Sequence, residues 1–212
     1  QFEFLKKLFS YIINIMKSYK LLIIFILFLT QMVGCAPSTI LAIPASILDR
    51  RTTEVQIVDN QIFLAAWSPV EQIVKKEKEK SHYNLTVFNK AVVIVGEAPS
   101  EDVIKKITEV LSKIKNVKTV HNKMVVGKAC KIKQRAKDTI TTTNVKTRLF
   151  LEVRNELHPM HIKIMTENDV IYLLGIVNEK EADEAIQIAK SSKGVRLVVP
   201  LFELDETFKN KY

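Results

Sequence analysis

The sequence predicts an α+β protein made of two tandem copies of one small domain, each with the element order α-β-β-α-β and a small mixed three-stranded sheet packed by two helices. First, the chain repeats itself, since 85–96 aligns with 164–175 at an offset of 79 residues. Second, Asn89 and Asn168 begin turn dipeptides at matching positions, and Asn tolerates the positive φ that tight hairpins require. Third, each hairpin is followed by a segment with apolar residues at helical spacing.

The elements of the two copies follow from this alignment. In the first copy we predict a helix, two hairpin strands, a helix and a last strand over 57–74, 83–88, 91–97, 100–114 and 117–126. In the second copy the same elements are predicted over 139–154, 161–166, 170–177, 179–192 and 195–203. Acidic residues begin the second helix of each copy, where their negative charge interacts favourably with the positive end of the helix dipole. The apolar faces of these helices are Val103, Ile107, Val110 and Ile114, and Ala182, Ala185, Ile186 and Ala189.

Gly96 and Gly175 end the second strand of each copy. A glycine at this place permits a close backbone approach or an unusual φ. Neither glycine opens a phosphate-binding loop, because no Gly-x-Gly or Gly-Lys-Ser/Thr pattern follows. We therefore expect a structural role for both.

The domains are predicted at 53–127 and 138–204, with a linker at 128–137 and a C-terminal tail at 205–212. No acidic residue lies between Glu109 and Asp138. The linker carries the basic residues Lys128, Lys131, Lys133, Arg135 and Lys137. Two interpretations stay open: these charges attract an anionic surface, or they only keep the linker soluble.

The N-terminal part has the composition of a secretory signal, which we place at 16–34. Lys17 and Lys20 precede an unbroken apolar run at 21–29, about half of the roughly 20 residues that a spanning helix needs. Because the weakly polar flank lengthens this run, an uncleaved membrane anchor is the alternative. Residues 1–15 are interpreted as lying upstream of the true start at Met16, with a longer basic region as the alternative.

Residues 32–35, Met-Val-Gly-Cys, resemble the bacterial lipobox, although Met32 stands where Leu is usual. This resemblance predicts a lipid on Cys35 and a lipidated tether over 35–52, and several buried acyl chains give stable attachment. Ala36, directly after the cysteine, is similar to the residues found there in lipoproteins sent to the outer membrane. Cys130 would then be a lone thiol, and a Cys35–Cys130 disulfide is the competing interpretation.

The chain resembles the BON-domain family, named for bacterial outer-membrane and nodulation proteins. The residues that carry the resemblance are 92–96 and 171–175, each a strand that ends in glycine, then an acidic-capped helix and a strand with the pattern Gly/Asn-Val-Lys/Arg-x-Val. A lipobox before two such domains is similar to the lipid-anchored outer-membrane members of this family. The resemblance implies an outer-membrane location, at the periplasmic face of a Gram-negative bacterium.

In those members the second domain binds anionic phospholipid through its first helix. The matching candidate positions, with the charge that Arg148 adds on the same helix, are Ile140, Val145, Lys146, Arg148, Leu149 and Phe150. Ile140 stands where the family has a tryptophan that enters the membrane, and Ile lacks the interfacial preference of Trp. We therefore expect binding that is weaker or centred elsewhere.

The expected function is non-enzymatic: binding of anionic phospholipid in support of outer-membrane integrity. Without residues 1–34 the chain keeps 28 basic and 22 acidic residues, and this net charge of +6 favours anionic partners. Nucleic acid is not expected, since an exported chain rarely meets it and the sequence carries no recognition motif. The alternative is a protein-interaction adaptor for envelope assembly or stress response, in contact with outer-membrane assembly machinery. No catalytic or cofactor motif is present, and we expect a structural role for His158 and His161, with no metal site.

Overall fold

The computed structural model describes residues 49–76, 81–152 and 157–207, all within one compact unit. The predicted signal peptide at 16–34, Cys35 and the tether up to residue 48 lie outside the described residues. In the described part of the chain, no helix combines the length and the apolar character needed to cross a membrane.

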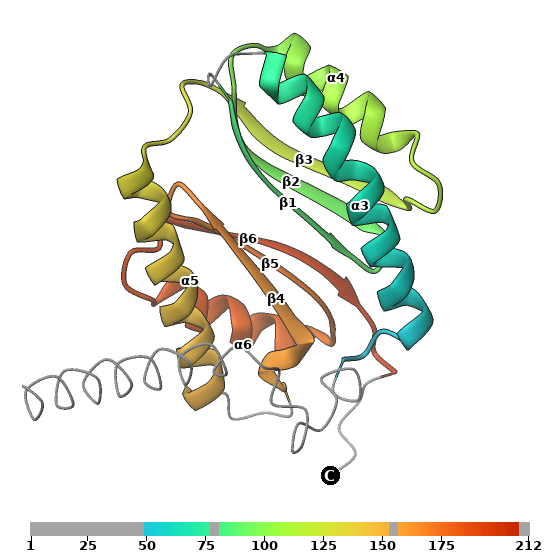
Figure 1. The fold of residues 1–212 in the computed structure, drawn as a ribbon. Coiled ribbons are helices and arrows are strands. Elements are labelled where there is room, and N and C mark those ends of the chain that lie inside the picture. Colours follow the sequence, from blue (N-terminus) through green and yellow to red (C-terminus); the bar gives the residue numbers. More distant parts are fainter. Residues whose placement is uncertain (1–48, 77–80, 153–156, 208–212) are drawn as a thin grey trace, which may run out of the picture. The chain divides into compact units, whose positions relative to one another are not determined.

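The order α-β-β-α-β is confirmed in both copies (Figure 1). The first domain consists of α3 (Thr53–Lys76), β1 (His82–Phe88), β2 (Ala91–Ala98), α4 (Glu101–Ser112) and β3 (Thr119–Val126). The second consists of α5 (Ile132–Glu152), the 3₁₀ turn η1 (Pro159–His161), β4 (Ile162–Glu167), β5 (Val170–Val177), α6 (Glu179–Lys190) and β6 (Leu197–Leu204).

Each sheet is mixed, as predicted. In the first sheet β2 is central, antiparallel to β1 and parallel to β3, and β5 takes the same place between β4 and β6. A parallel pair needs a crossover connection, and α4 and α6 supply it. The hairpin turns have positive φ at both central residues, 48° and 64° at Asn89 and Lys90 and 50° and 63° at Asn168 and Asp169, which is the type I′ geometry that matches strand twist.

A buried aspartate on the first helix of each domain holds the hairpin turn of that domain. The Asp59 carboxylate accepts hydrogen bonds from the two turn amides at 2.8 and 2.7 Å. Asp138, 79 residues later, accepts the equivalent pair at 3.0 Å each. Both side chains are 4% exposed. This contact fixes the register between helix and hairpin, and it extends the internal repeat into α3 and α5.

The apolar core of each domain lies between its two helices and one face of its sheet. In the first domain the predicted helix-face residues Val103, Ile107 and Ile114 belong to the core, and Leu111 takes the place predicted for Val110. The opposite faces of the two sheets share a third apolar cluster, formed by Phe88, Val93, Val95, Val170, Tyr172 and Leu174. Strands β2 and β5 are therefore buried on both faces.

Two predicted boundaries are wrong. Helix α5 begins at Ile132, about seven residues before the prediction, so that Lys133, Arg135 and Lys137 lie on the helix and only 128–131 connect the domains. The segment 131–137 consists mainly of good helix formers and contains no glycine or proline to stop the helix. Helix α3, at Thr53–Lys76, exceeds its predicted range of 57–74 at both ends, and Pro69 lies inside it.

The end of the predicted tether belongs to the folded part. Arg50 binds the carboxylate of buried Glu181 on α6 with two bonds of 2.6 Å and donates to the Ile176 carbonyl at 2.9 Å. Arg51 binds Asp59 at 2.6 Å and lies 4.1 Å from the ring centre of Phe88. The chain is thus fixed to the fold from about residue 50 onward.

Replacing Arg50 by alanine is expected to lower the free energy of unfolding by about 2 kcal/mol near neutral pH, because the charged bonds to Glu181 are lost. Burial opposes ionisation of Glu181, but Arg50 and the Asn178 amide outweigh it and hold the pKa of Glu181 below its ordinary value of 4.5. The pair therefore stabilises the fold above pH 4.5, and this contribution is lost as the pH falls through the folded pKa. Urea unfolding between pH 7 and 3 tests this, and an unchanged acid sensitivity in the variant contradicts it.

Candidate functional site

Helix α5 presents its predicted site residues on two different sides. Asp138, Thr141, Val145 and Leu149 face the core at helical spacing. Ile140 and Phe150 lie on the outward side and are 70% and 72% exposed. The outward side of α5 is therefore partly apolar.

Two of the candidate lipid contacts need correction. Val145 is 0% exposed and Leu149 is 1% exposed, because both lie on the buried stripe of α5. Val145 packs within the core and positions the helix, but in this fold it cannot insert into a membrane. Ile140, Lys146 and Phe150 are the candidates that the structure leaves accessible.

Arg148 makes its contacts inside the domain. Its guanidinium forms two bonds of 2.7 Å with Glu152, one turn later on α5, and this hydrogen bonding holds the pKa of Glu152 below its usual range. It also donates to the Ile188 carbonyl at 2.9 Å and to the Ser192 hydroxyl at 2.8 Å, at the end of α6. Arg148 therefore ties α5 to α6 rather than pointing toward a ligand.

A groove of about 420 Å³ runs beside the C-terminal half of α5. Lys146 and Phe150 line it from the helix, with Leu149 at its floor, and Lys163 of β4 lines the opposite part. The remaining lining residues are Asp49, Arg51, Phe88, Pro159, Met160, Ile162 and Ile164. Since Arg51 is paired with two aspartates, Lys146 and Lys163 supply the positive charge of a mostly apolar groove.

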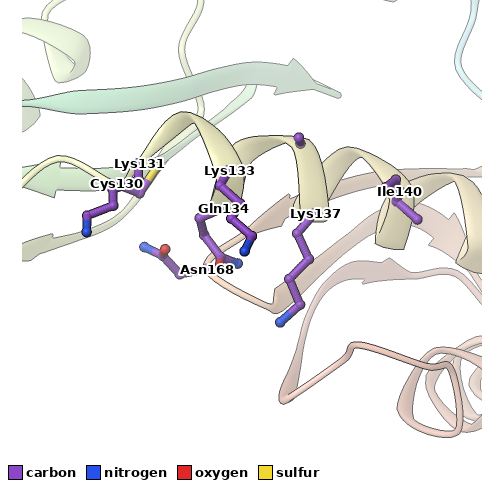
Figure 2. Close-up of a pocket in the computed structure, with 8 residues that line it drawn as sticks. Cys130, Lys131, Lys133, Gln134, Lys137, Ile140 and Asn168 are labelled. Atoms are coloured by element: carbon purple, nitrogen blue, oxygen red, sulfur yellow. The ribbon is translucent and has the colours of Figure 1, made fainter.

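Three of the five basic residues predicted as a linker, Lys131, Lys133 and Lys137, line a second hollow of about 660 Å³ at the N-terminal end of α5. Figure 2 shows Lys131, Lys133, Lys137 and Ile140 on α5 and the residue before it, with Asn168 drawn below Gln134. Lys137 is bound to Asp169 at 2.8 Å, and this hydrogen bond lowers the pKa of the Asp169 carboxyl. Positive charge therefore lies at two separate places on α5, in this hollow and at Lys146 in the groove, with no basic residue between Lys137 and Lys146.

The sequence analysis missed an exposed apolar strip on α3. Ile57, Leu64 and Trp67 are 54%, 68% and 51% exposed, and Phe63 lies beside them at 37%. Their spacing of seven and then three residues places Ile57, Leu64 and Trp67 on one helix face. Once Asp59 is aligned with Asp138, Trp67 corresponds to Lys146, so the two domains carry different side chains at the same helical position.

The remaining predicted residues have structural contacts. A Cβ added to Gly175 would lie 2.6 Å from the His161 carbonyl oxygen, so this glycine allows β4 and β5 to approach. His158 accepts a hydrogen bond from the Met160 amide, and the ring of His161 accepts one from the His158 amide, which caps η1. Burial and nearby Arg50 lower the pKa of His161 to about 4.

The fold and its duplicated sequence pattern define the class. The BON domain pattern matches residues 68–128 and 137–206, so the chain belongs to the BON-domain family, with two domains in tandem. The chain is 30% identical to the outer membrane lipoprotein DolP of Haemophilus influenzae over 158 residues, which are 73% of this chain and 79% of that protein.

Two further comparisons are more distant. The chain is 25% identical to a 21 kDa hemolysin of Actinobacillus pleuropneumoniae over 122 residues, which are 58% of this chain and 62% of the relative. The solved structure of CdsD, a structural protein of the type III secretion system of Chlamydia trachomatis, has a TM-score of 0.27 at 11% identity, covering 65% of this chain and 92% of that one. A score this low carries no argument about function.

Proposed function

We propose that this chain is a lipid-anchored outer-membrane protein of the periplasmic face that binds anionic phospholipid through α5 and supports outer-membrane integrity. The similarity to an outer membrane lipoprotein supports the location, and the lipobox-like residues 32–35 support an anchor at Cys35. Lipid attachment would keep α5 close to the bilayer at all times. Even a modest affinity of α5 for lipid would then be enough to keep the helix bound to the bilayer.

One observation carries the lipid-binding part: exposed Lys146 and exposed Phe150 line the same groove on α5. A basic side chain near an anionic surface contributes about 1 kcal/mol. An apolar neighbour adds burial in the acyl region. Lys163 supplies further charge in the groove, whereas Lys133 lies on a different face of α5, because 13 residues at about 100° each place it roughly 140° around the helix from Lys146.

Flotation of residues 44–212 with vesicles tests this proposal, because the fragment lacks the apolar N-terminal run. We expect recovery with vesicles that contain phosphatidylglycerol and little recovery with phosphatidylcholine alone. The double variant Lys146→Glu with Phe150→Ser should weaken binding about tenfold or more, since reversing one charge alone removes roughly 2 kcal/mol. Lys106→Glu, the same charge reversal on exposed α4, is the matched control. Equal recovery on both kinds of vesicle contradicts the proposal.

The exposed strip on α3 favours a second candidate function, that of a protein-interaction adaptor. Ile57, Leu64 and Trp67 form an apolar surface, and such surfaces commonly mark protein contacts. Crosslinking in cells separates the two candidates. If Trp67→Ser removes a protein crosslink and the α5 double variant leaves the membrane phenotype intact, the adaptor function is favoured.

A further inference from the structure

Three side chains with metal-binding atoms meet at one point of the fold. His82 is the first residue of β1, Cys130 lies in the segment between β3 and α5, and Glu167 ends β4. One ligand atom from each lies within 4.8 Å of the other two. His82 Nε2 lies 3.6 Å from Glu167 Oε2, and Cys130 Sγ lies 3.4 Å from Glu167 Oε1.

We propose that these residues form a zinc site, with Cys130 Sγ, His82 Nε2 and a Glu167 carboxylate oxygen as ligands and a water in the fourth position. Thiolate, imidazole and carboxylate are the three protein ligands that Zn²⁺ takes. Around a tetrahedral ion with bonds of about 2.0–2.3 Å, neighbouring ligand atoms are roughly 3.3–3.7 Å apart. The distances at Glu167 fall in this range but run to its two different oxygens, and the three ligand atoms lie within 4.8 Å of one another, so the side chains must draw together by about 1 Å around an ion.

The charges around the cluster favour a cation. Glu97 and Glu167 are 4% and 5% exposed, and among the described residues neither carboxylate forms an ion pair with a lysine or arginine. Glu97 accepts hydrogen bonds from the Cys130 amide, at 3.0 Å, and from the Asn168 side chain. Glu167 pairs with the His82 imidazole, and a divalent ion between these two groups would add positive charge that offsets the cost of burying both carboxylates.

The ligands are held in place by neighbouring residues. Asn84 donates to Glu167 Oε2 at 2.8 Å, which orients the carboxylate toward His82 and Cys130. Glu97 fixes the backbone at Cys130. Such supporting hydrogen bonds are typical of metal sites, where they set ligand orientation and affinity.

An ion can reach the cluster. A polar cavity of about 450 Å³ is lined by His82, Asn84 and Glu167, and Cys130 also lines the 660 Å³ hollow at the start of α5. The ligands come from the first domain, the connection and the second domain. Bound zinc would therefore join the two domains at their junction and stabilise the folded chain in proportion to its occupancy.

Cobalt and zinc titration of the full chain in detergent tests the proposal. In a Cys35→Ser background, where Cys130 is the only thiol, we expect one Co²⁺ per chain with a thiolate charge-transfer band that Zn²⁺ removes. Cys130→Ser, His82→Gln and Glu167→Gln should each weaken Zn²⁺ binding by at least about 100-fold, and Asn84→Ala by roughly 10- to 100-fold. His121→Gln, on β3 outside the cluster, should leave binding unchanged.

A second measurement avoids variants that fail to fold. In the unsubstituted chain, Zn²⁺ should slow alkylation of Cys130, which peptide mass mapping distinguishes from Cys35. The proposal is overturned if Co²⁺ gives no thiolate band, if Cys130→Ser binds Zn²⁺ as tightly as its parent, or if Zn²⁺ leaves the alkylation rate of Cys130 unchanged. Neither measurement depends on lipid binding, so failure of the zinc site and failure of the proposed function are separate results.

Discussion

Replacing Gly96 by alanine is expected to destabilise the first domain by more than about 4 kcal/mol or to prevent its folding. Gly96 lies on β2 opposite Tyr83 and has a φ of +129°, which residues with a Cβ rarely adopt. An added Cβ would collide with the His82 carbonyl oxygen and lie 2.8 Å from the Tyr83 Cα. Both atoms belong to the backbone of the paired strand, so no side-chain rotation relieves the clash.

Urea unfolding of residues 44–212, followed by circular dichroism, measures this effect. Gly127→Ala is the matched control, because the nearest atom to its added Cβ is Glu97 Cγ at 3.9 Å, an ordinary contact. We expect the control to unfold close to the unsubstituted protein. A cooperative transition with an unchanged midpoint in Gly96→Ala would show that the strand pairing tolerates a side chain here.

Replacing Asp59 by alanine is expected to lower the free energy of unfolding by about 3–5 kcal/mol. The change removes the acceptor of two turn amides and leaves Arg51, bound to Asp59 at 2.6 Å, without that partner. Buried donors that lose their acceptor retain the full cost of desolvation. Asp59→Asn keeps one oxygen acceptor, so its free energy of unfolding should lie between those of the unsubstituted protein and Asp59→Ala.

Calorimetric or urea unfolding of the same fragment provides the measurement. The matched control is Asp183→Ala on α6, an exposed aspartate, for which we expect a change within about 0.5 kcal/mol. The hairpin turn can also be followed by the exchange rates of the Asn89 and Lys90 amides, which should increase in Asp59→Ala. Similar losses in Asp59→Ala and Asp183→Ala would show that the turn contact contributes little.

The fold was predictable because its signals are local and occur twice. Asn89 and Asn168 mark both hairpins, and the alignment of the repeats places every strand within a few residues. The start of α5 was harder to predict, because 131–137 is basic and polar, and such residues are as common in linkers as on solvated helix faces. The unbroken apolar run at 92–95 did indicate that both faces of this strand are buried, since such strands lack the usual alternation of apolar and polar residues.

The candidate site was predictable only in part. Helical spacing from Asp138 is sufficient to place Val145 and Leu149 in the core, whereas the family resemblance alone suggested that these two residues contact lipid. The zinc cluster has no sequence signal of comparable strength. Its ligands are separated by 48 and 37 residues and lie in three different elements, so only the packed fold brings them together.

The apolar cluster between the two sheets bears on how this chain arose by duplication. A single copy of the domain would leave one apolar face of its sheet exposed to water. Joining two copies back to back hides both surfaces at once, and thereafter each half protects the other from aggregation. Removal of either domain would therefore expose this apolar face of the other and favour its aggregation.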